Sequence, residues 1–112
     1  MDFLEKILKE KANEVNNLTP VEKRVEKQRP SFYQAVKGNP KKVHIIGEIK
    51  RASPSKGLIN GTVDILQQAK TYETAGVSAI SVLTDPVFFN GTIHDLTAVA
   101  QVVDVPVLCK DF

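Results

Sequence analysis

The chain has 112 residues, a single cysteine and a formal net charge of +2, with 15 Lys or Arg against 13 Asp or Glu. This length suits one small domain, one cysteine excludes an internal disulfide, and interspersed charges with few aromatic residues argue against a nucleic-acid-binding groove. The sequence has no apolar stretch of membrane-spanning length, no signal-peptide segment and no His or Cys cluster at metal-ligand spacing. We therefore expect a soluble, cytoplasmic protein with no membrane partner and no metal.

The first 42 residues differ in character from the rest of the chain. Apolar residues recur there at helical spacing: Phe3, Leu4, Ile7, Leu8, Ala12 and Val15. This stripe predicts a helix to about Asn16. The charged stretch 19–29 predicts a loop or a short exposed helix, and 31–36 a short helix that ends at Gly38. We interpret residues 1–42 as an N-terminal helical extension packed beside the strands, not as a separate domain.

Three short apolar runs in residues 43–112 predict β-strands that begin near positions 45, 79 and 106. Runs this continuous are typical of parallel strands covered on both faces. Between them, amphipathic patterns predict helices over 63–75 and 93–103, with Thr62 and Thr92 as N-caps and Gly76 ending the first helix. The predicted element order is therefore β-α-β-α-β.

This order favours an α/β fold, either a (β/α) barrel or a doubly wound parallel sheet. No Gly-x-Gly-x-x-Gly follows a strand, which argues against a dinucleotide site. A complete barrel typically needs roughly 250 residues. We therefore expect residues 43–112 to hold only the first three strands and two crossover helices of a larger fold.

Charged residues gather at the carboxyl ends of two predicted strands. Because side chains alternate along a strand, Glu48 and Lys50 point to the same face, roughly 7 Å apart. Lys110 again stands at the end of an apolar run. Charges on a buried strand are unfavourable unless the strand opens into a polar cavity, and in both candidate folds the active site lies at these strand ends. The residues alone leave a purely structural Glu–Lys ion pair open.

Residues 48–57, Glu-Ile-Lys-Arg-Ala-Ser-Pro-Ser-Lys-Gly, resemble the signature of the indole-3-glycerol phosphate synthase family. The resemblance continues through residues 81–85, 88–92 and 107–112, and the N-terminal helix and residues 28–32 are similar to that family's N-terminal segment. It therefore covers almost the whole chain, in order.

The resemblance implies a (β/α)8 TIM barrel that closes the ring of 1-(2-carboxyphenylamino)-1-deoxyribulose 5-phosphate, with loss of carbon dioxide and water and without metal or organic cofactor. It implies that Lys110 is the general acid and that Glu48 and Lys50 are the acidic and basic residues at the end of the first strand. It also implies substrate contacts for Ser53, Pro54, Leu83, Phe89 and Phe112.

The family's remaining functional groups belong to later strands of the barrel, so we expect the isolated chain to be inactive or weakly active and to self-associate. Two alternatives remain open. One is a different barrel enzyme in which Lys110 forms a Schiff base. The other is a non-catalytic piece that needs a complementing chain.

Overall fold

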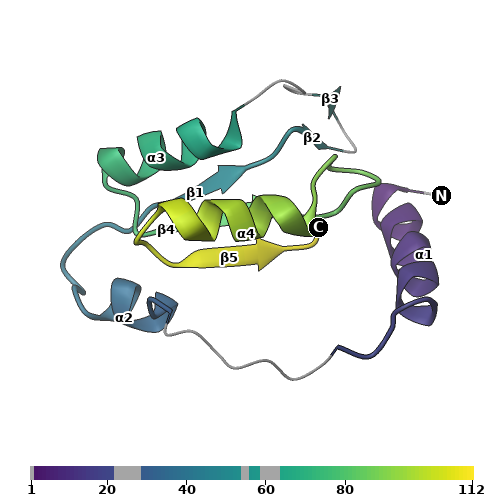
Figure 1. Ribbon diagram of the computed structural model, residues 1–112, viewed down its shortest axis with the longest axis horizontal. Helices are drawn as coiled ribbons and strands as arrows, with labels where there is room; N and C mark the ends of the chain where they lie inside the picture. The colour runs from purple at the N-terminus through teal and green to yellow at the C-terminus, as the bar shows by residue number, and fades with distance from the viewer. Residues whose placement is uncertain (1, 22–28, 54–55, 59–63) are drawn as a thin grey trace.

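The computed structural model describes residues 2–21, 29–53, 56–58 and 64–112. Its centre is a three-stranded parallel sheet in the order β1-β4-β5 (Figure 1). The strands and their connecting helices are β1 (Ile46–Ile49), α3 (Ile65–Ala75), β4 (Ala79–Leu83), α4 (Ile93–Val102) and β5 (Val107–Lys110). The predicted β-α-β-α-β order and the parallel sheet are thus confirmed.

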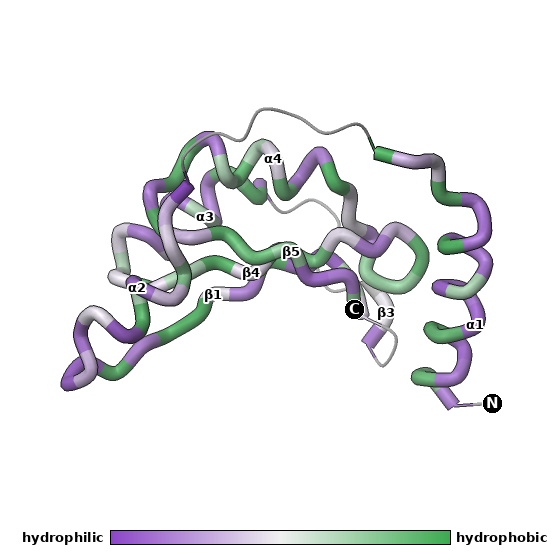
Figure 2. Tube along the Cα trace, turned by 90° about the horizontal axis from the view of Figure 1, so that it is seen from below, coloured by the Kyte–Doolittle hydropathy of each residue, from purple (hydrophilic) through white to green (hydrophobic). Residues whose placement is uncertain are grey.

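Both connecting helices pack on one face of this sheet. Ile80 and Val82, two residues apart on β4, share one buried cluster with Ala69 of α3 and Val99 of α4, and Figure 2 shows the two helices on the same side of the strands. A doubly wound sheet would have helices on both faces. Consecutive strands with helices on one face agree instead with part of a (β/α) barrel.

The register sends the charged residues to the opposite face. Glu48 pairs with Ser81, and Leu83 pairs with Lys110. Residues paired across a parallel ladder point to the same side, and that side alternates along each strand. The face without helices therefore carries Glu48, Ser81, Leu83 and Lys110, as expected for side chains that line a barrel interior.

The structure agrees with the predicted cap of α4 and corrects that of α3. Thr92 caps α4, because its hydroxyl accepts the amide N–H of Asp95 at 3.0 Å. Helix α3 was predicted from residue 63 with Thr62 as its cap, but it begins at Ile65, and residues 62 and 63 lie outside the described part. Its cap is Asp64, whose carboxylate accepts the N–H groups of Leu66 and Gln67.

The loop after β1 contains an element that the sequence did not predict. Strands β2 (Ala52–Ser53) and β3 (Gly57–Leu58) form a short antiparallel pair in a stretch expected to be only a loop. Gly57 has a φ of +62°, a conformation that favours glycine. Two-residue strands leave no periodic pattern in a sequence, so this hairpin could not be read from hydropathy.

The N-terminal region forms α1 (Phe3–Asn16) and α2 (Phe32–Lys37), close to the predicted bounds. Figure 1 shows α1 beside the carboxyl ends of the strands and α2 toward their other end. Only Ile7 of the apolar stripe is buried, whereas Phe3, Leu4 and Leu8 are about half exposed. Residues 22–28 of the predicted loop lie outside the description, and the boundary at residue 42 stays a prediction. None of the described helices is long and apolar enough to cross a membrane.

The sheet leaves apolar surface uncovered beside its last strand. A groove of about 450 Å³ lies between α4 and β5 and is lined by Leu96, Ala100, Val107 and Cys109 among others. Within the described residues, β1 and β5 each pair with β4 alone. Open strand edges and uncovered apolar side chains favour association with another copy.

We expect the 112-residue chain, studied alone, to self-associate in sedimentation velocity experiments. A reducing agent is the control, because it removes disulfide-linked dimers through the exposed Cys109 thiol and should leave the association unchanged. A monodisperse monomer that melts cooperatively would contradict this prediction.

Candidate active site

A carboxylate between two ammonium groups forms the centre of the candidate site. Glu48 Oε1 lies 4.0 Å from Lys50 Nζ, and Glu48 Oε2 lies 3.7 Å from Lys110 Nζ. These distances allow ion pairing but are too long for direct hydrogen bonds. All three side chains are between 34% and 45% exposed, so a ligand could reach them. The structure thus brings together the three charged residues predicted to be catalytic.

Helix α3 fixes the position of β1 and therefore of Glu48. The Tyr72 hydroxyl donates to the Glu48 backbone carbonyl at 3.0 Å. On the preceding residue of the strand, a Cβ added to Gly47 would lie 2.6 Å from the Tyr72 ring. Glycine at position 47 therefore lets the ring lie directly on the strand. This contact holds the backbone behind Glu48 while its carboxylate points to the other face.

Strand β4 holds the end of β5 that carries Lys110. The Lys110 carbonyl accepts the backbone N–H of Thr84 at 2.9 Å and its hydroxyl at 3.4 Å. Leu83, the register partner of Lys110, is only 2% exposed. A predicted apolar substrate contact thus lies beside the predicted general acid, but little of its surface is open in this structure.

The remaining predicted substrate contacts lie on three different segments. Phe89 is half-buried in the loop after β4, and Phe112 is exposed two residues beyond Lys110. Ser53 is buried in β2, where its hydroxyl accepts the Lys56 N–H at 3.3 Å. Pro54 lies outside the described residues. The structure places three of these side chains on segments that follow the strand ends, and their roles in substrate binding stay predictions.

An ion pair that the sequence analysis missed connects the loop after β1 to α4. The Arg51 guanidinium donates to both carboxylate oxygens of Asp95 and, at 3.3 Å, to the Asn90 carbonyl. Its hydrogen bonds with Asp95 raise the pKa of Arg51, although burial opposes this. In the sequence, Asp95 was recognisable as an acidic residue in the first turn of a predicted helix. That position indicated a role at the helix N-terminus and gave no sign of the pairing with Arg51.

A second missed cluster surrounds Lys11 of α1. Its ammonium lies 2.5 Å from Asp85 Oδ1, 2.8 Å from Asp111 Oδ1 and 3.0 Å from Glu14 Oε2. Burial disfavours the charge of this lysine, but hydrogen bonds to Asp111, Asp85 and Glu14 outweigh it and raise the pKa of Lys11. Because the pKa of Lys11 is higher in the folded protein than in the unfolded chain, its charged form stabilises the fold. This stabilisation is complete at neutral pH and is lost only as the pH rises through the raised pKa.

The position of Lys11 in the sequence carries a signal that could have revealed this cluster. It lies one helical turn after Ile7, on the side of α1 that faces the sheet. The three carboxylates approach within 4.8 Å of one another, as metal ligands do. The Lys11 ammonium binds all three and supplies the positive charge there.

Comparison with known proteins gives a consistent result. The family model described as indole-3-glycerol phosphate synthase matches residues 4–112. The chain is 56% identical to the indole-3-glycerol phosphate synthase of Listeria welshimeri, 48% to that of an Exiguobacterium species and 46% to that of Lactococcus lactis. These alignments cover 98–100% of the chain but only 42–44% of the relatives. The chain thus spans less than half the length of these proteins.

Proposed function

This chain belongs to the indole-3-glycerol phosphate synthase family, and from that premise we propose that it supplies part of the active site of such an enzyme. The proposed reaction is ring closure of 1-(2-carboxyphenylamino)-1-deoxyribulose 5-phosphate to indole-3-glycerol phosphate, in tryptophan biosynthesis. The observation that carries the proposal is the Glu48 carboxylate between two ammonium groups, at the carboxyl ends of β1 and β5, the two strands that flank β4 in the parallel sheet.

Lys110 is the proposed general acid. Ring closure joins the anthranilate ring to the ribulose carbonyl carbon, and negative charge develops on the carbonyl oxygen. An ammonium can donate a proton to that oxygen, or stabilise its charge through a hydrogen bond. After carbon dioxide has left, the same oxygen departs as water and again needs a proton. A single lysine at the end of β5 can serve both steps if it regains its proton between them.

Glu48 and Lys50 have supporting roles in this proposal. Glu48 orients the neighbouring ammonium groups, because its two oxygens face different lysines. The substrate carries a carboxylate and a phosphate, so Lys50 can bind an anionic group while Lys110 transfers protons. Ser53, Leu83, Phe89 and Phe112 lie on segments suited to contact the rest of the substrate, and the proposed contact of Pro54 falls on a residue outside the described part of the chain.

We further propose that turnover requires the rest of the barrel. Phosphate sites in such barrels are typically built from the loops after strands seven and eight, whereas the described sheet has three strands. The chain spans 44% of the Listeria welshimeri relative. The complete enzyme would use no metal or organic cofactor and would act in the cytoplasm.

The test joins this chain to the part of the Listeria welshimeri relative that follows the aligned region, and we call the product the fusion enzyme. We expect the fusion enzyme to form indole-3-glycerol phosphate, detected by indole fluorescence after chromatography, and the 112-residue chain alone to form none. The intact Listeria protein is the positive control. A folded but inactive fusion enzyme, or turnover by the chain alone, would contradict the proposal.

Glu48→Gln in the fusion enzyme is expected to lower kcat, because the two neighbouring ammonium groups lose the carboxylate that orients them. Steady-state kinetics at one pH measure the change. Glu5→Gln, on the first turn of α1, is the matched control. An unaltered kcat for Glu48→Gln would indicate a structural ion pair instead.

A further inference from the structure

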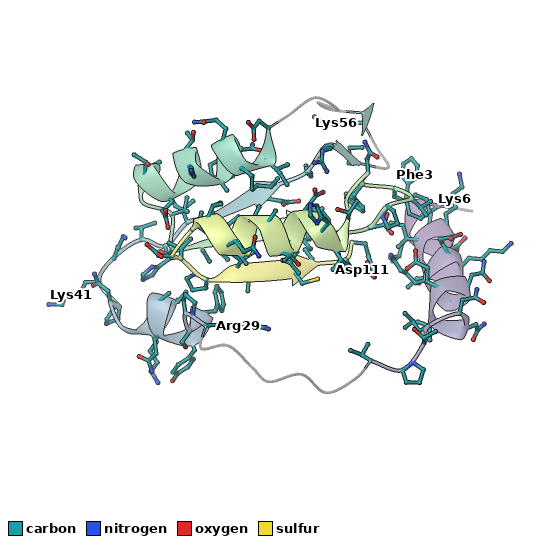
Figure 3. All side chains as sticks on the ribbon, in the orientation of Figure 1. Phe3, Lys6, Arg29, Lys41, Lys56 and Asp111 are labelled. Carbon is teal, nitrogen blue, oxygen red and sulfur yellow. The ribbon has the colours of Figure 1, made fainter. Side chains whose placement is uncertain are left out.

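Lys11 connects three parts of the molecule that are distant in the sequence. Its ammonium reaches from α1 to Asp85, just beyond β4, and to Asp111, just beyond β5. Figure 3 shows Asp111 at the end of β5 that faces α1. Among the described residues, Lys11 is the one cation that pairs with either of these carboxylates.

Asp85 in turn holds the loop that carries Phe89. One of its oxygens binds Lys11, and the other accepts the backbone N–H groups of Phe88 at 2.6 Å and Phe89 at 3.3 Å. Its backbone carbonyl accepts the N–H of Gly91 at 2.8 Å. Asp85 is completely buried. A buried carboxylate is strongly unfavourable without a charge partner, so the loop in this conformation depends on Lys11.

Asp111 stands between two residues of the candidate site, Lys110 and Phe112. Its side chain is 53% exposed, and Lys11 is its described ion-pair partner. The same ammonium therefore holds both the loop with the proposed ring contact and the segment with the proposed general acid. Neither contact involves the side chain of Glu48, Lys50 or Lys110.

We propose that Lys11 is a positioning residue that fixes the Phe89 loop relative to the Lys110–Phe112 segment, so that helix α1 helps to shape the active site. The kinetic part of this proposal rests on the proposed function. The structural part does not, because it concerns only contacts within this chain. The raised pKa of Lys11 keeps the connection charged throughout the neutral range.

The first experiment measures amide hydrogen exchange in the 112-residue chain by NMR. Lys11→Met is expected to speed the exchange of the Phe88 and Phe89 amides by about tenfold or more, the effect of weakening a charge-assisted hydrogen bond. The Ile80 amide, bonded to the Pro106 carbonyl, is the internal reference and should not change. Lys6→Met is the matched control, since Lys6 lies over the Phe3 ring of the same helix.

Four outcomes of this experiment are decisive. Faster exchange at Phe88 and Phe89 with unchanged exchange at Ile80 supports the proposal, as does restored protection in Lys11→Arg. Unchanged exchange at Phe89 overturns it, because the loop is then held without Lys11. Equal loss of protection at Ile80 and Phe89 also overturns it, because Lys11 would then stabilise only the fold as a whole.

The second experiment is a double-mutant cycle in the fusion enzyme. Lys11→Met is expected to raise KM more than it lowers kcat, since Phe89 is proposed to contact the substrate in the ground state. Lys11→Met should lower kcat/KM by a smaller factor in the Phe89→Leu background than in the unsubstituted enzyme, because both changes disturb the same contact. Strictly additive effects would overturn the kinetic part. An inactive fusion enzyme would refute the proposed function, and the exchange experiment would still decide the role of Lys11.

Discussion

Lys110→Ala in the fusion enzyme is expected to lower kcat by about 10²-fold or more, the usual contribution of one general acid. Substrate should still bind, because proton donation stabilises the transition state more than the ground state. Steady-state kinetics give kcat and KM, and equilibrium titration with substrate confirms binding to the variant. The matched control is Lys41→Ala, an exposed lysine near α2 at the other end of the sheet (Figure 3).

Two results would contradict this role for Lys110. If kcat is unchanged and only KM rises, Lys110 binds the substrate without donating a proton. If borohydride traps a covalent adduct of substrate on Lys110, the residue acts as a nucleophile through a Schiff base. Neither result would affect the assignment of the chain to its family.

Gly91→Ala is expected to destabilise the protein by about 3 kcal/mol, because overpacking a buried site forces the backbone to move. A Cβ at this position would lie 2.1 Å from the backbone carbonyl oxygen of Leu83 and 2.9 Å from the backbone carbonyl carbon of the same residue. Both are backbone atoms of β4, so no side-chain rotation can relieve the contact. The loop would move away from the strand, and the hydrogen bond from Gly91 to the Asp85 carbonyl would break.

Urea unfolding of the fusion enzyme, followed by circular dichroism, measures this loss. Gly57→Ala is the control: its φ of +62° disfavours alanine, but its Cβ would meet no atom within 4 Å. We expect the free energy of unfolding of Gly57→Ala to fall by about 1 kcal/mol, the usual effect of a side chain in the left-handed region. Equal losses for the two variants would show that the loop adapts to a side chain at position 91.

The features predicted correctly from the sequence are those with a local periodic pattern. Unbroken apolar runs identified β1, β4 and β5, and amphipathic spacing identified the helices between them. Strand alternation placed Glu48 and Lys50 on one face, and the apolar run before Lys110 placed it at the same edge of the sheet. These predictions needed only the geometry of individual strands and the parallel order of the sheet.

The contacts that were missed join residues with no local pattern between them. Arg51 and Asp95 are 44 residues apart, and Lys11 lies 74 residues from Asp85. A lysine within an amphipathic helix is ordinarily a solvated residue, and the spacing of Lys11 from Ile7 indicates the side of the helix but not the partner. Only the position of α1 beside the strand ends, set by tertiary packing, makes it a partner for a buried carboxylate.

The connection through Lys11 also constrains the order in which the protein folds. Lys11 belongs to α1, and its partner Asp111 is 100 residues later in the chain. Closing so long a loop has a large entropic barrier and comes after local contacts have formed. We therefore expect α1 to dock last during folding and to detach first when the protein opens locally. Unfolding would then begin at the helix that holds the candidate site together.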